Sequence, residues 1–124
     1  MTPNHYRDLV RYQIGYEITW ALLHPQGERS AFCQEIMENS RNERLMIEEV
    51  VRTEDGRKQI VCRPNPFEVT RVADQWTDTF LQRGMQLDQA RIPELEEGLR
   101  FFTEAMRELQ KTPGNDPAAQ QDVR

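Results

Sequence analysis

Histidine and cysteine are scarce in this chain, and neither residue type gathers into a cluster. His5 and His24 lie roughly 28 Å apart if the segment between them is one helix, at a rise of about 1.5 Å per residue. Cys33 and Cys62 fit no CxxC or mixed Cys/His spacing of the kind that holds zinc. Motifs for nucleophilic hydrolysis, phosphate loops and dinucleotide binding do not occur. We therefore expect no metal site, no cofactor and no catalytic residues.

Long apolar runs are also missing. No segment approaches the roughly 20 apolar residues that cross a bilayer as a helix. No cationic-then-apolar leader opens the chain, and the cysteines show no disulfide framework. We therefore expect a cytoplasmic protein without a membrane partner.

Basic residues do not gather on any one segment, and the formal net charge is -5 at pH 7. Proteins that bind nucleic acid through phosphates usually present a basic face or tail. The densest basic stretch alternates with acids, so we interpret it as a mixed, solvated surface. Its basic residues are Arg52, Arg57, Lys58 and Arg63, and its acids are Glu48, Glu49, Glu54 and Asp55. No nucleic-acid partner is expected.

Hydrophobic residues make up 37% of the 124 positions, which is enough for one core if they are placed on one face of each element. The periodicity predicts a mainly α, four-helix bundle-like single domain over residues 1–111, followed by a flexible C-terminal tail, 112–124. The helices are expected near 3–24, 28–53, 66–84 and 93–111. A short extended segment is expected between the second and third helices.

The third helix has the clearest start signal. Asn65 is a good N-cap, Pro66 suits the first helical position, and Glu68 follows three residues after the cap. Apolar residues then recur at helical spacing, and we expect Trp76 to lie centrally on that buried face.

The second segment allows two structures. Its apolar residues keep helical phase from about Glu28 to Arg52, which favours one long helix. The alternative places a strand at Leu45–Arg52 that turns at Asp55-Gly56 onto Gln59–Arg63, which would make the protein α+β. Asn39-Ser40-Arg41-Asn42 is the point at which the long helix is weakest.

The first segment is also ambiguous, because apolar and polar residues alternate over residues 10–22 as in a half-buried strand. Its length and its terminal signals, Thr2-Pro3 and His24-Pro25-Gln26-Gly27, favour a helix. Such a helix carries two apolar stripes on nearly opposite sides, although a bundle needs one. We name one of them the aromatic stripe. It comprises Tyr12, Tyr16 and Trp20.

The aromatic stripe is the candidate partner-binding site. Tyr and Trp provide large contact areas, and their polar atoms tolerate a wet rim. The competing interpretation is that the stripe is buried within its own domain, with the first helix at the centre of the bundle.

Carboxylates occur in pairs, which raises a metal-dependent activity as an alternative. Most of these acids fall off the apolar sectors, and only Glu43 falls on a core-facing one. The pairs are Glu35/Glu38, Glu48/Glu49, Asp74/Asp78 and Glu104/Glu108.

These features predict a small acidic protein-binding factor, such as a regulator, adaptor, inhibitor or chaperone-like protein, without enzymatic activity. Its partner is another protein, or a second copy in a homodimer. The alternative is a helical metal-dependent nucleotide phosphohydrolase. A third hypothesis is a nucleic-acid-associated regulator.

Overall fold

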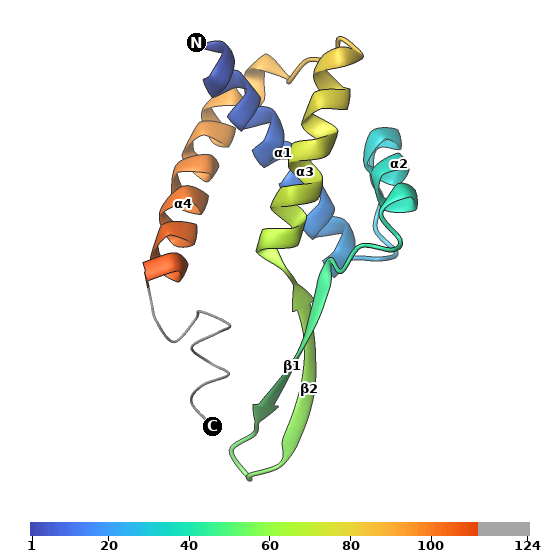
Figure 1. The fold of residues 1–124 in the computed structure, drawn as a ribbon, viewed down its shortest axis with the longest axis vertical. Coiled ribbons are helices and arrows are strands. Elements are labelled where there is room, and N and C mark those ends of the chain that lie inside the picture. The colour runs from blue at the N-terminus through green and yellow to red at the C-terminus, as the bar shows by residue number, and fades with distance from the viewer. Residues whose placement is uncertain (112–124) are drawn as a thin grey trace. The chain divides into compact units, whose positions relative to one another are not determined.

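A computed structural model describes residues 1–111 of the chain, which are mainly helical with one two-stranded antiparallel sheet (Figure 1). They fall into two compact units, residues 1–86 and a unit that begins at Leu87. The expected tail, 112–124, lies outside the described residues, and the single domain over 1–111 stays a prediction. The elements are α1 (Pro3–Leu23), α2 (Ala31–Asn39), β1 (Met46–Arg52), β2 (Lys58–Pro64), α3 (Pro66–Gln82), a short 3-10 helix η1 (Gln89–Arg91) and α4 (Ile92–Lys111).

The first segment is the helix α1, not a strand. The Thr2 hydroxyl accepts a hydrogen bond from the His5 N–H at 3.1 Å, and Pro3 occupies the first turn. At the other end the His24 N–H donates to the Trp20 carbonyl at 2.9 Å. Because both ends are capped, the backbone groups that a helix leaves unpaired are partly satisfied. One face of α1 is buried by Leu9, Val10, Ile14, Ile18 and Ala21.

Helix α3 starts as predicted and packs against α1. The Asn65 side chain accepts a hydrogen bond from the Phe67 N–H at 3.1 Å. Its buried residues are Val69, Val72, Ala73, Thr77 and Phe80. The buried Thr77 hydroxyl donates to the Ala73 carbonyl at 2.7 Å, so it carries no unpaired polar group into the core. Trp76 does not lie at the centre of this face. It is half-buried and meets Phe32 edge-on, with the ring centroids 5.7 Å apart.

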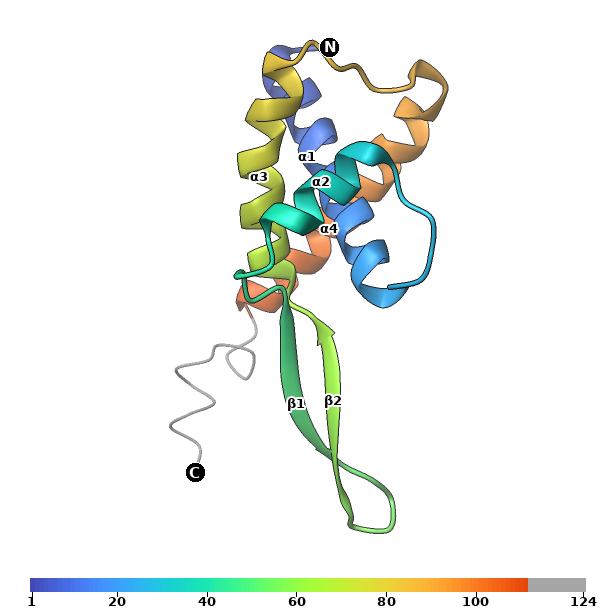
Figure 2. The same cartoon turned by 90° about the vertical axis from the view of Figure 1, so that its right-hand side faces the viewer.

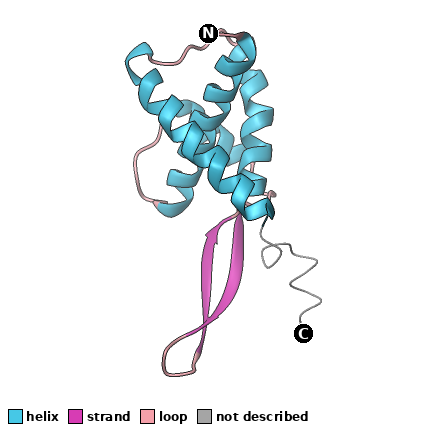
Figure 3. Cartoon of the chain, turned by 90° about the vertical axis from the view of Figure 1, so that its left-hand side faces the viewer, coloured by secondary structure: helices cyan, strands magenta, loops and turns pink. Residues whose placement is uncertain are grey.

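The predicted second helix is wrong beyond Asn39. The Ser30 hydroxyl caps α2 by accepting from the Cys33 N–H at 3.1 Å, but α2 ends after nine residues. The rest of that segment includes β1, which pairs with β2, so the α+β alternative fits and a pure four-helix bundle is not confirmed (Figure 3). Spacing misled the prediction because Ile47, Val50 and Val51 suit a helical face as well as a strand. Pairing with the later segment decides the structure, and single-segment periodicity does not contain it.

The hairpin, defined as β1, β2 and the turn between them, extends away from α1, α2 and α3 (Figures 1 and 2). Its register is regular, with Val50 opposite Ile60 and Arg52 opposite Lys58. Gly56 supplies the positive φ of 83° that the turn requires. Most side chains of both strands are exposed, and each strand is an edge of the two-stranded sheet.

The second unit contains η1 and α4. The Asp88 side chain accepts from the Ala90 N–H at 3.0 Å and starts η1, which leads directly into α4. The fourth predicted helix is therefore confirmed, with Leu95 as its buried residue. None of the helices within residues 1–111 combines the length and apolarity needed to cross a membrane.

We expect Gly15→Ala to stabilise the first unit. A Cβ atom at position 15 would lie 3.7 Å from the Ala73 Cβ, which is ordinary van der Waals contact. Alanine in a helix interior is more stable than glycine by about 0.5–1 kcal/mol. Urea denaturation should show a gain of that size in the free energy of unfolding. A loss would mean that α1 and α3 approach more closely than described.

The two thiols should react at very different rates. Burial raises the pKa of the Cys33 thiol to about 11, and the nearby Glu17 carboxylate adds to this shift. At pH 8 only about one Cys33 thiol in a thousand is then ionised, and the ionised form is the nucleophile. Cys62 is exposed. A thiol reagent should modify Cys62 rapidly and Cys33 only on unfolding, and Cys62→Ser should abolish the fast phase. Two fast thiols would contradict the packing of α2.

Candidate functional site

The structure places the aromatic stripe on the side of α1 roughly opposite Ile18, a side on which Leu9 is buried. Tyr16 is two residues from both Ile14 and Ile18, so at 100° per residue it points to the opposite side of the helix. Ile14 and Ile18 are 1% and 0% exposed, whereas Tyr16 is 54% exposed and Trp20 37%. Tyr12 is half-buried. Two of the three predicted site residues are therefore exposed in part, and the third is half-buried.

The rings of the aromatic stripe are held by neighbours on their own segment. The Tyr12 and Tyr16 rings are tilted against each other with centroids 6.5 Å apart. The Trp20 ring lies 4.6 Å from the His24 ring. The indole also lies against Gly27 in the turn after α1. A Cβ atom at position 27 would come within 2.3 Å of the end of the indole. A ring held in this way loses less conformational freedom on binding than a free one.

The turn that supports Trp20 is built from the C-terminal end of α1. The Gly27 N–H donates to the His24 carbonyl at 2.9 Å and brings residue 27 back toward the helix. The Arg29 side chain donates to the Pro25 carbonyl at 3.0 Å. Glycine is needed at position 27 because any side chain there would displace the indole.

The acids near α1 are engaged in ion pairs with arginines. Arg7 donates to Asp78 at 2.7 Å and to Asp74 at 3.5 Å, and Arg11 lies 3.6 Å from Asp74. The hydrogen bond to Asp78 raises the pKa of the Arg7 guanidinium. These contacts cross from α1 to α3 on the solvent side, so the carboxylates orient the two helices.

The other predicted acid pairs also lie on the surface. Glu35 accepts two hydrogen bonds from Arg83, at 2.9 and 2.6 Å. Hydrogen bonding to Arg83 lowers the pKa of the Glu35 carboxyl. Glu43 was expected on a core-facing sector, but it is exposed and pairs with Arg71. The reason is that residue 43 follows α2 and does not belong to a helix. Across residues 1–111, no group of three or more His, Cys, Asp or Glu side chains could hold a metal ion.

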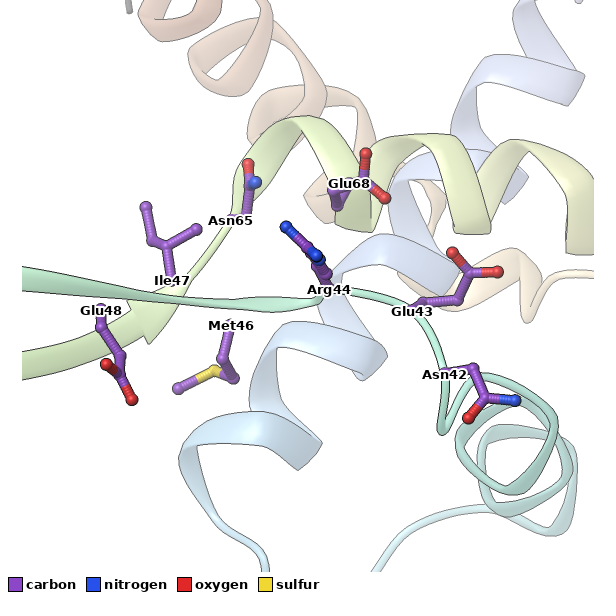
Figure 4. A pocket seen from close by; sticks show the side chains of 8 residues that line it. All are labelled: Asn42, Glu43, Arg44, Met46, Ile47, Glu48, Asn65 and Glu68. Carbon is purple, nitrogen blue, oxygen red and sulfur yellow. The ribbon is translucent and has the colours of Figure 1, made fainter.

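An open cavity of about 640 Å³ lies at the base of the hairpin, between the loop after α2, β1 and the start of α3 (Figure 4). Arg44 extends along it toward Asn65 and Glu68, while Met46 and Glu48 project from the other side of β1. Its walls are mainly charged and amide side chains, in contrast to the aromatic stripe. The sequence does not predict this cavity, because its walls come from three segments that meet only after the hairpin forms.

The hairpin also carries exposed apolar residues. Val50 is 62% exposed and its cross-strand partner Ile60 is 64% exposed, on the same face of the two strands. The sequence signal for this hairpin was the Asp55-Gly56 turn between two short segments in the α+β alternative. Exposed neighbouring apolar side chains often mark interaction surfaces.

Two surfaces of the first unit therefore stand out. One is the aromatic stripe of α1, and the other is the hairpin with the cavity at its base. No family model matches the chain, and neither a curated protein nor a solved structure matches it.

Proposed function

We propose that this chain is a small acidic protein-binding factor without enzymatic activity, and that the aromatic stripe contacts its partner. The observation that carries the proposal is the division of α1 into two faces. One face is buried against α2 and α3, and the other presents Tyr16 and Trp20 at 54% and 37% exposure. An aromatic surface of this kind is costly to leave in water and is a common anchor in protein interfaces.

The chemistry of the stripe suits a partner surface that is mainly apolar and has polar groups at its rim. Tyrosine and tryptophan cover large areas with few rotatable bonds, and each carries one polar group that can bond at a wet rim. Leu23 is 56% exposed one turn beyond the stripe and lengthens the apolar surface toward the end of α1. The complementary surface is a groove on another protein, lined by apolar side chains and by carbonyl or carboxylate acceptors.

The support of Trp20 by Gly27 and His24 adds a second argument. Rigid anchors give more affinity per contact because less side-chain entropy is lost on association. The close approach of the indole to Gly27 keeps the ring against the surface while one side remains accessible. Such a surface is ready to bind before the partner arrives.

Replacing the exposed aromatics should separate binding from folding. Tyr16→Ala and Trp20→Ala should each lower the free energy of unfolding by less than about 1 kcal/mol, because exposed side chains contribute little to the core. Each should weaken partner binding roughly 30-fold, the size of an interface hot spot. Affinity purification from native lysate with mass spectrometry would identify the partner, and calorimetry with that partner would measure the loss.

Two further variants sharpen this experiment. Phe67→Ala is the matched control, because Phe67 is an aromatic residue with 51% exposure on α3 and lies outside the stripe. It should bind as the wild type does. Gly27→Ala keeps all three aromatics but displaces the Trp20 ring, so it should weaken binding without removing an aromatic. If Tyr16→Ala and Trp20→Ala both unfold the chain, or if both keep every partner, the stripe is not the binding surface.

A further inference from the structure

The free edge of β1 carries a regular set of backbone groups that pair with nothing in the hairpin. The Thr53 N–H donates to the Arg57 carbonyl, and the Asn65 N–H donates to the Leu45 carbonyl. In an antiparallel pair the hydrogen-bonded positions alternate, so the odd-numbered residues of β1 bond to β2. The N–H and C=O groups of Glu48, Val50 and Arg52 must then point outward. An exposed edge of this kind is a template for another strand.

Two charged side chains along this edge also have no ion-pair partner in the part of the chain that the structure describes. Glu48 and Arg52 form no ion pair within residues 1–111, although Glu49 pairs with Arg63 at 3.0 Å. They share one face of β1 but are four residues apart, about 13 Å along a strand, which is too far for a mutual contact. Arg52 lies directly opposite Lys58, so two positive charges face each other across the hairpin.

We propose that β1 pairs antiparallel with β1 of a second copy of this chain, with the two-fold axis at Val50. The product is a four-stranded antiparallel sheet in the order β2, β1, β1, β2. This inference does not rest on the aromatic stripe, because it uses a different surface.

Charge complementarity selects this register. With the axis at Val50, Glu48 of each copy lies opposite Arg52 of the other, and the two valines face each other. The outward backbone groups of all three residues then pair directly. An axis at Glu48 or Glu49 would put two carboxylates face to face. An axis at Val51 would place Glu48 opposite Glu54.

The other strand is poorly suited to the same role. Along β2 the charged side chains are Lys58 and Arg63, so pairing β2 with itself gathers positive charge. Pro64 at its end has no N–H to donate. In addition, β2 is the strand that contacts α1. The available edge is therefore β1.

The four-stranded sheet explains the exposed apolar pair of the hairpin. In the dimer Ile60 and Val50 of one copy continue into Val50 and Ile60 of the other, as one row across four strands. These side chains are 64% and 62% exposed in one copy alone. A lone two-stranded ribbon is marginal in water, and adding strands with a shared apolar row stabilises it.

The same register brings the turn of one copy to the cavity at the base of the other hairpin. Glu54 comes opposite Met46, next to Arg44, which forms no ion pair within the described part of the chain. The cavity is lined in part by β1, as Figure 4 shows for Met46, Ile47 and Glu48. The positive charge of Arg44 in the cavity and the negative charge of Glu54 in the turn of the other copy are a second complementary contact.

Backbone variants test the edge directly. Val50→Pro removes an N–H that points away from β2, so it leaves the hairpin bonds intact but deletes one bond from each copy at the dimer axis. Sedimentation of the full chain should show a dimer for the wild type and a rise of at least roughly tenfold in the dimer dissociation constant for Val50→Pro. Lys58→Pro is the matched control, because its N–H lies on the free edge of β2 and its side chain lies outside the apolar row. It should retain the dimer.

Charge variants test the register without touching the backbone. Glu48→Arg and Arg52→Glu should each weaken the dimer by roughly tenfold, since each turns two attractive contacts into repulsive ones. The double variant should restore wild-type association. If Val50→Pro fails to fold, this set decides the proposal. A double variant that is no better than the singles overturns the register.

A distance measurement separates the hairpin from the stripe. In this sheet the two Cys62 Cα atoms are three strand spacings and four residues apart, or about 20 Å. A spin label on the exposed Cys62 should report a distance near that value in the wild type. A chain that is monomeric at all concentrations overturns the proposal. So does a dimer that survives Val50→Pro and dissociates with Trp20→Ala, which would assign self-association to the stripe.

Discussion

Helix α1 packs against α3 along the side that includes Gly15, where a Cβ atom would lie in ordinary van der Waals contact with Ala73 and Val69. The rest of the first unit follows from this contact. It fixes which residues of α1 are buried, and it leaves α2 and β2 to cover what α3 does not. Residues two apart on a helix point to nearly opposite sides, so burial of Ile14 and Ile18 directs Tyr16 outward. The exposed aromatic surface and the core are two sides of one packing choice.

The arginines on the surface act together with this packing. Arg7 and Arg11 join α1 to α3, Arg83 joins α3 to Glu35 of α2, and Arg71 joins α3 to the loop after α2. Exposed ion pairs of this kind contribute little to stability one by one. Their effect is on orientation, since a guanidinium has a fixed geometry that a carboxylate must meet. Helix α3 is the common member, so it sets the positions of α1, α2 and the base of the hairpin.

The sequence predicted those elements whose ends are encoded locally. Thr2 and Asn65 suit the N-cap position, and the proline after each suits the first turn of a helix. Both helix starts are confirmed. It did not predict the end of α2, because Ile47 and Val50 fit a helical face until Ile60 is available to pair with them. The position of the aromatic stripe on α1 followed from spacing alone. Its exposure did not, since this depends on which side α3 covers, and the cavity at the hairpin depends on three separate segments.

The hairpin has a consequence for how the chain folds. The packing of α1 against α3 joins segments far apart in the chain, and closing so long a loop is entropically unfavourable and slow. Pairing β1 with β2 brings Leu45 and Asn65 together through a hydrogen bond of 2.8 Å. This local step removes the residues between them from the loop that α1 and α3 must close. Wherever the strand pair has formed, the two helices therefore close a shorter loop, at a lower entropic cost.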